Sequence, residues 1–127
     1  MIVLDASAAI AALLRDGSAR EAVASEQLHV PHLIDAEVVH TLRRLVAVGR
    51  LPALSGQRLV ITWSELGLVR HPFHALLPRM WELRENVSAY DATYITLAEA
   101  LGCALLTADA RLARAPGTAC PITVVSS

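Results

Sequence analysis

The sequence predicts an α/β protein in which a central parallel sheet of about five strands is flanked by helices on both faces. Short, mostly apolar runs recur along the chain, and longer segments with helical patterns separate them. Strands of a parallel sheet are buried on both faces, so they appear as continuous apolar runs. Parallel pairing also requires a crossover between strands, which is usually a helix. A chain of 127 residues is expected to form one domain, over residues 1–127.

Taken in chain order, strands and helices alternate through most of the sequence. The predicted strands cover residues 2–4, 28–30, 68–71, 104–107 and 122–125. The predicted helices cover residues 6–15, 18–25, 32–49, 51–67, 73–86, 88–102 and 109–114.

Cap and turn residues support several of these boundaries. Ser18 and Glu21 have the spacing of a capping box, in which two side chains satisfy the free N–H groups of a helix start. Ser88 is expected to cap a helix that stops at Gly102. Pro78 lies early in a predicted helix, where it occupies the first turns or causes a kink.

The composition excludes several classes of protein. No apolar run reaches the ~18 residues of a membrane span, and the start lacks the basic segment of a signal peptide, so we expect a cytoplasmic protein. Cys103 and Cys120 lack metal-site or redox spacing and are expected to be free thiols. All 11 basic residues are arginine, which excludes chemistry that requires a lysine.

Four acidic residues lie where a parallel sheet presents its ligand site. Asp5 directly follows the first predicted strand, and Asp109 lies just past the fourth. Asp91 lies in the first turn of a helix, and Glu37 lies early in the helix after the second strand. In open α/β sheets, ligands bind outside the carboxyl ends of the strands. The four carboxylates can therefore converge at one edge.

Each acid also has a purely structural explanation, because Asp5, Asp91 and Asp109 could be helix caps or first-turn acids and Glu37 a solvated helix residue. Together, however, closely packed carboxylates repel one another and resist ionising. A hard divalent cation removes that cost, and oxygen ligands suit Mg²⁺ or Mn²⁺. The five histidines show no spacing typical of a histidine-based metal site.

Asp35 competes with Glu37 for the place at the sheet edge. The two residues are about 200° apart around a helix, so only one can face the sheet. The apolar residues at positions 34, 38, 42 and 45 place the buried face slightly nearer to Asp35. The helical pattern alone therefore does not select Glu37.

The chain resembles the PIN-domain ribonucleases, and among them the toxins of VapBC toxin–antitoxin pairs. The resemblance rests on "IVLDASA", "VPHLIDAEVVHTLRR", "AYDATYITLAEALGCALLTADARL" and a closing short strand, in that order. It implies a single PIN domain with a PIN-like fold, and it implies that a quartet of acids holds the metal and carries catalysis. Residue by residue, the quartet falls on Asp5, Glu37, Asp91 and Asp109, which selects Glu37 over Asp35. Ser7 and Thr107 stand where similar proteins assist the metal with a hydroxyl, although both are also ordinary turn and strand-end residues.

The activity implied by this resemblance is that of an endoribonuclease that hydrolyses RNA phosphodiesters with Mg²⁺, for which Mn²⁺ could substitute, and thereby arrests growth. The resemblance also implies a homodimer, and a cognate VapB-type antitoxin that lays an apolar helix in a groove. Helices 6–15 and 18–25 and the helix after Pro31 are the expected walls of that groove. Four arginines are candidate phosphate contacts, since guanidinium pairs well with phosphate oxygens: Arg43, Arg44, Arg111 and Arg114.

Other functions with a similar layering fit less well. A receiver-type phosphoacceptor domain needs a lysine, and a haloacid-dehalogenase-type phosphatase needs an aspartate where Ser7 stands. The remaining alternative is a PIN-like module that binds RNA or protein without cutting. Residues 51–86 carry no motif that indicates a function.

Overall fold

The computed structural model describes all residues 1–127 and contains a five-stranded sheet in the order β3-β2-β1-β4-β5. Every neighbouring pair of strands is parallel, which confirms the predicted sheet. The strands are β1 (Ile2–Leu4), β2 (Leu28–Pro31), β3 (Val69–His71), β4 (Ala104–Thr107) and β5 (Ile122–Val124). β1 lies at the centre, so the residue that follows it emerges in the middle of the sheet edge.

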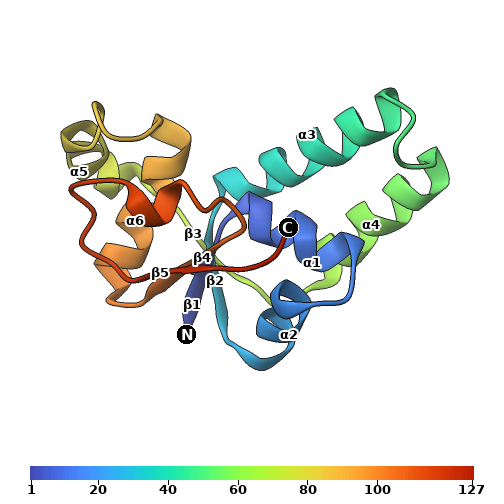
Figure 1. Cartoon of the computed structure of the whole chain (residues 1–127), viewed down its shortest axis with the longest axis horizontal. Helices are drawn as coiled ribbons and strands as arrows, with labels where there is room; N and C mark the ends of the chain where they lie inside the picture. Colours follow the sequence, from blue (N-terminus) through green and yellow to red (C-terminus); the bar gives the residue numbers. More distant parts are fainter.

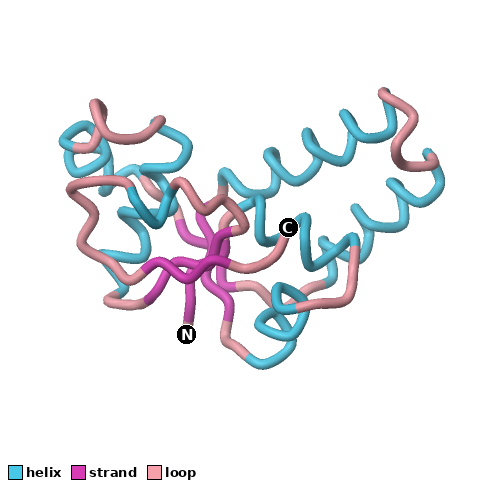
Figure 2. The backbone as a smooth tube through the Cα atoms, viewed as in Figure 1, coloured by secondary structure: helices cyan, strands magenta, loops and turns pink.

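The helices cover the sheet in two groups (Figures 1 and 2). They are α1 (Ala6–Leu14), α2 (Ser18–Ser25), α3 (Leu33–Ala47), α4 (Ala53–Glu65), α5 (Leu77–Glu82) and α6 (Ala89–Leu101), with 3₁₀ turns η1 (His74–Leu76) and η2 (Leu112–Arg114). α1 to α4 lie on one side of the sheet and α5 and α6 on the other, because right-handed crossovers change sides when the strand order reverses. None of these helices combines the length and the apolar character needed to cross a membrane.

The core forms where α1 and α6 pack on the central strands and α3 packs against α1. The side chains of Val3, Leu4, Val30 and Leu105 are fully buried in the sheet. Each such side chain stabilises the fold by about 1.5–3 kcal/mol relative to its exposed form. α6 is buried along most of its length, over residues 92–98, so its first turn is held firmly against the sheet edge.

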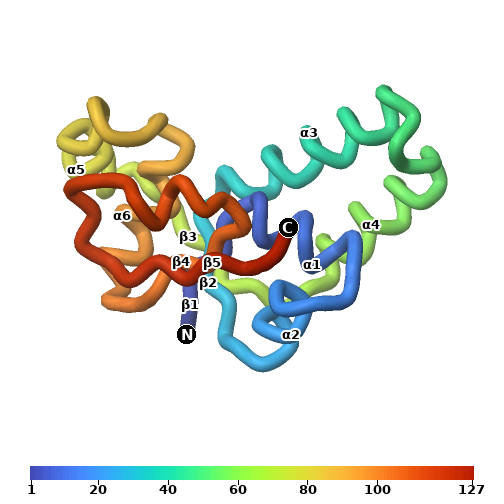
Figure 3. Tube along the Cα trace, viewed as in Figure 1, coloured from blue at the N-terminus to red at the C-terminus, as the bar shows by residue number.

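The carboxyl edge of the sheet is opposite the N terminus. Figure 3 shows the chain entering β1 at one end of the sheet, while α1 and α3 start from the other end. Asp5 caps α1 directly after β1, and Ser88 caps α6 as predicted. Gly102 adopts a left-handed conformation at the end of α6, with φ 66°, as expected for the glycine that stops this helix.

Two predicted helices are wrong in extent. The helix predicted over 73–86 is η1 followed by the short α5, with Pro78 in the first turn of α5 and turns over residues 83–86. The helix predicted over 109–114 contains only η2, because the Asp109 carboxylate accepts the N–H of Arg111 and forms a turn first.

The capping box predicted at the start of α2 is also absent. Gly17 is the N-cap residue and provides no side-chain hydrogen bond. The hydroxyl of Ser18 instead accepts the N–H of Ser126 at 3.3 Å. Ser18 therefore ties α2 to the end of the chain.

Candidate active site

The four predicted acids approach one another at the carboxyl edge of the sheet. Asp5 follows β1, which lies between β2 and β4. Glu37 comes from α3, which follows β2, and Asp109 comes from the loop after β4. Asp91 lies in the first turn of α6. The charge of Asp91 raises the pKa values of both Asp5 and Glu37, and the charge of Asp109 raises that of Asp91, so the four form one electrostatic cluster.

Asp5 has the helix-capping role that its position suggests. Its Oδ1 accepts the N–H of Ala8 at 2.9 Å and the hydroxyl of Ser7 at 2.7 Å. Burial raises the pKa of Asp5, against the lowering effect of Thr107, Ala8 and Ser7. Because both of these hydrogen bonds engage Oδ1, the cap leaves Oδ2 for a ligand. Capping and metal binding are therefore compatible at this residue.

Ser7 and Thr107 connect Asp5 to the loop that carries Asp109. The two hydroxyl oxygens are 3.2 Å apart. The N–H of Ala108 donates to Ser7 Oγ at 2.9 Å, and the N–H of Asp109 donates to Thr107 Oγ1 at 3.0 Å. These bonds fix the loop after β4 against the start of α1. Assistance to a metal ion by either hydroxyl stays a prediction.

Asp35 and Glu37 have separate partners in the structure. The Asp35 carboxylate accepts two bonds from Arg70, at 2.7 and 3.0 Å, and one from the Trp63 indole at 2.7 Å. It therefore ties α3 to β3 and α4. Glu37 instead faces the other acids and accepts the hydroxyl of Tyr94. Burial raises the pKa of Glu37, and Asp91 and Asp5 raise it further.

Tyr94 was not predicted as part of the site. It lies three residues after Asp91, on the same face of α6, so helical spacing alone could have indicated it. Burial raises the pKa of its hydroxyl, and the hydrogen bond to Glu37 adds to the shift. The hydroxyl therefore stays protonated and, as a hydrogen-bond donor, orients Glu37.

Asp91 and Asp109 differ in their electrostatic environment. Burial raises the pKa of Asp91, and its backbone N–H donates to Ser88 Oγ at 3.1 Å. Asp109 pairs with Arg111, whose guanidinium lowers the pKa of that carboxyl. Arg111 is otherwise free, with 85% of its side chain exposed. Of the four arginines proposed as phosphate contacts, Arg111 directly contacts an acid of the cluster.

A polar cavity of about 230 Å³ opens beside these two acids. We call it the acidic cavity; its lining residues are Asn86, Val87, Asp91, Asp109, Arg111, Leu112 and Ala115. Asn86 comes from the segment 51–86, in which the sequence showed no functional motif. Only the tertiary structure brings it to the site.

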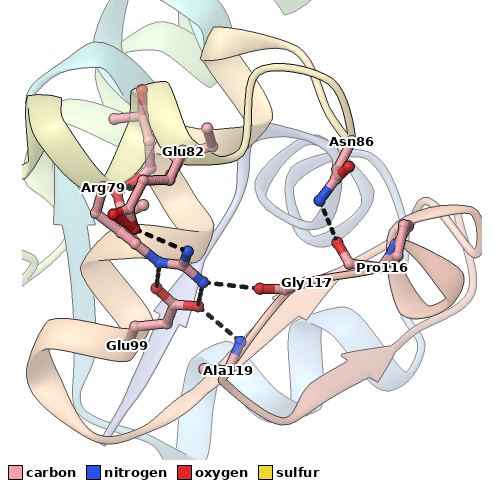
Figure 4. Close-up of polar contacts among 10 residues, drawn as sticks. Arg79, Glu82, Asn86, Glu99, Pro116, Gly117 and Ala119 are labelled. Carbon is pink, nitrogen blue, oxygen red and sulfur yellow. Dashed lines mark hydrogen bonds and ion pairs between the residues drawn. The ribbon is translucent and has the colours of Figure 1, made fainter.

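A hydrogen-bond network holds the wall of this cavity in place (Figure 4). The Arg79 guanidinium binds both Oε atoms of Glu99, at 2.9 and 3.1 Å, and donates to the carbonyl of Gly117 at 2.7 Å. The Asn86 amide donates to the carbonyl of Pro116 at 2.9 Å. The loop after η2 is thus fixed to α5 and α6, which positions the acidic cavity.

The chemistry of the cluster fits a hard divalent cation. All four predicted ligands are carboxylates, and three of them have pKa values raised by burial and by neighbouring negative charge. No three side chains form a ready-made ligand set in the structure. Mg²⁺ does not need one, since it is commonly held by one or two carboxylates together with waters and substrate phosphate.

Comparisons with known proteins agree with the fold. A family model described as the PIN domain matches residues 2–117. Ribonuclease VapC9 of Mycobacterium tuberculosis is 57% identical over 125 residues, which cover 98% of this chain and 98% of the relative.

Two solved structures have the same fold. The crystal structure of Mycobacterium tuberculosis VapC20, described as a sarcin-ricin loop cleaving toxin, matches with a TM-score of 0.68 and 18% identity over 94% of this chain and 97% of that one. VapBC2 from Rickettsia felis, bound to a DNA fragment from their promoter, matches with a TM-score of 0.68 and 16% identity over 97% of this chain and 99% of that one. These structural matches confirm the PIN-like fold expected from the sequence.

Proposed function

Because this chain belongs to the PIN-domain family, and within it to the VapC ribonucleases, we propose that it is the endoribonuclease toxin of a toxin–antitoxin pair. The observation that supports cleavage best is the cluster of Asp5, Glu37, Asp91 and Asp109 at one sheet edge, where burial and neighbouring negative charge raise the pKa values of the first three. The close relatives are named as ribonucleases, which supports an enzyme and not the non-catalytic binding module.

Each residue of the cluster has a role that its contacts suggest. Asp5 and Asp91 are the most central ligands for Mg²⁺ or Mn²⁺, with Glu37 and Asp109 completing the set. When bound, the cation supplies charge neutralisation at the scissile phosphate and lowers the pKa of an attacking water. Tyr94 keeps Glu37 oriented toward the cluster. Arg111 can leave Asp109 and contact a phosphate, because its side chain is 85% exposed. A guanidinium group pairs well with phosphate oxygens.

The antitoxin part of the proposal is supported by an apolar groove on the opposite side of the sheet from α6. This groove has a volume of about 290 Å³, and its lining comes mainly from α1, α2 and α4, with Leu4 at the floor. The third wall of the groove comes from α4, whereas the sequence suggested the helix after Pro31 for this wall. An apolar helix from a small partner would bury this surface close to Asp5, the next residue after Leu4. The match to the Rickettsia felis VapBC2 structure supports a VapB-type partner.

Cleavage of RNA by the purified protein tests the enzymatic proposal. We expect total cellular RNA to be cut in the presence of Mg²⁺ or Mn²⁺ and to stay intact when a chelator is added. Equal cleavage with and without chelator would contradict the metal requirement, and no cleavage at any metal concentration would contradict the enzyme. The homodimer stays a prediction, which sedimentation velocity tests.

A further inference from the structure

An exposed aromatic surface lies next to the acidic cavity and takes no part in the site described above. A cavity of about 550 Å³ is lined chiefly by Leu77, Met80, Trp81, Arg84 and Val87, which we call the Trp81 surface. Trp81 is 67% exposed, whereas the other tryptophan, Trp63, is 3% exposed. A contiguous exposed apolar patch with polar residues at its rim is typical of an interaction site or a ligand-binding groove.

Arg84 gives this surface a fixed positive charge. Its guanidinium carbon lies 4.8 Å from the centroid of the Trp81 ring, and its Nη1 donates to the Trp81 carbonyl at 3.1 Å. The nearby acid Glu82 pairs with Arg79 instead (Figure 4). Arg84 therefore has no acidic partner in the structure and remains available to an anion.

The Trp81 surface and the acidic cavity share one wall residue. Val87 lines both of them. Ser88, which caps α6, lines the Trp81 surface, and Asp91 stands one helical turn further along. A flexible polymer whose phosphate lies at Asp91 and Asp109 can therefore continue past Val87 onto Trp81.

We propose that the Trp81 surface is a nucleotide-binding subsite, where an unpaired RNA base stacks on the indole and Arg84 contacts an adjoining phosphate. Proteins that bind single-stranded RNA use this combination of aromatic stacking and guanidinium contact. The inference rests on the proposed function, because the same strand is cut at the acid cluster.

A second copy of the chain fits this surface less well. A two-fold interface centred on Trp81 would bring the Arg84 side chains of both copies together, and like charges repel. RNA brings a negative charge to Arg84 and a flat ring to Trp81. The charge and the shape of the surface both favour the nucleotide.

Binding of a fluorescein-labelled single-stranded oligoadenylate, followed by anisotropy in Mg²⁺, tests the subsite. All variants carry Asp5→Asn to prevent cleavage. We expect Trp81→Ala to weaken binding about fivefold to 150-fold, which corresponds to the ~1–3 kcal/mol of one stacked base. Trp81→Phe should keep most of the affinity. Arg84→Gln should weaken binding and reduce its salt dependence. The matched control is Leu54→Ala, an apolar residue of α4 that is 57% exposed, and it should bind like the parent.

Several results would overturn the subsite. These are Trp81→Ala binding as tightly as the Leu54→Ala control, or no binding of the probe by the parent. A third is Trp81→Ala converting a dimer to a monomer while RNA affinity is unchanged, which would assign the surface to a second copy. If Trp81→Ala has a lowered melting temperature, the RNA affinities of Trp81→Phe and Arg84→Gln relative to the parent test the subsite instead. Cleavage of RNA by the wild type is measured separately, so failure of the ribonuclease proposal is distinguishable from failure of the subsite.

Discussion

Asp35 and Glu37 lie two residues apart on α3, and we predict that their loss has opposite consequences. Asp35→Asn should lower stability and leave most of the cleavage activity. Glu37→Gln should abolish cleavage and leave stability unchanged or slightly raised. The reason is that Asp35 holds α3 to β3 and α4 through Arg70 and Trp63, whereas Glu37 faces the acid cluster.

The cost of Asp35→Asn follows from its contacts. The substitution removes the negative charge that accepts the two bonds from Arg70, at 2.7 and 3.0 Å. The asparagine oxygen can still accept the N–H of Trp63. The carboxylate and the guanidinium are 43% and 32% exposed, so solvent weakens the pair relative to a buried one. We expect a loss of about 1–2 kcal/mol in the free energy of unfolding. For a chain of this length the melting temperature should fall by about 5 °C.

Thermal melts and RNA cleavage on the same preparations test this pair. The Arg70 guanidinium lowers the pKa of Asp35, so the stabilisation is present above the unfolded pKa and is lost as the pH falls. The difference in melting temperature between wild type and Asp35→Asn should therefore shrink below about pH 4. Equal loss of cleavage in the two variants at equal folded fraction would refute the division of roles.

Two further variants test the electrostatics of the fold. Asp91→Asn should leave stability at neutral pH unchanged or modestly raised, because burial and the charge of Asp109 raise the pKa of Asp91 and make its negative charge unfavourable. The variant should also show a smaller rise in melting temperature when Mn²⁺ is added. A lower melting temperature with an unchanged response to Mn²⁺ would mean that Asp91 is only a first-turn acid. Burial and the neighbouring His71 lower the pKa of His29, so as the pH falls the unfolded chain takes up the proton before the folded one does. The wild type should therefore lose stability below about pH 6.5, and His29→Gln should lose less. Identical pH profiles for this variant and the wild type would contradict that role for the histidine pair.

The sequence predicted the sheet and three of the four acid positions from local signals. β1 ends directly before Asp5 and β4 ends two residues before Asp109, so the place of both acids at the edge follows from the strand ends. Asp91 was placed by Ser88, whose cap is present in the structure. The strand order was not predictable, because nothing local specifies which strands pair.

Other features depend on contacts between distant parts of the chain. The helical pattern of α3 did not separate Asp35 from Glu37, because the choice depends on Arg70 and Trp63 in later elements. The family resemblance selected Glu37, and the structure places it in the cluster. Trp81 and Asn86 reach the site region because the segment predicted as one helix starts as η1 and gives way to turns after α5. Helical periodicity gave no indication of these changes.

Replacement of Asp5 by asparagine tests the central claim most directly. Asn at this position keeps the size of the side chain and can still accept the N–H of Ala8, so the variant should fold. It removes the charge that a hard cation requires. Each ~1.4 kcal/mol of lost transition-state stabilisation lowers the rate tenfold, so we expect cleavage to fall by several powers of ten.

The measurement is growth and RNA integrity after induction of the wild type or Asp5→Asn in a host without the antitoxin, at matched soluble levels. We predict that the wild type arrests growth with cleaved RNA, while cells with Asp5→Asn grow and keep their RNA intact. Equal arrest by both proteins at equal soluble levels would show that toxicity does not come from metal-dependent cleavage at the acid cluster.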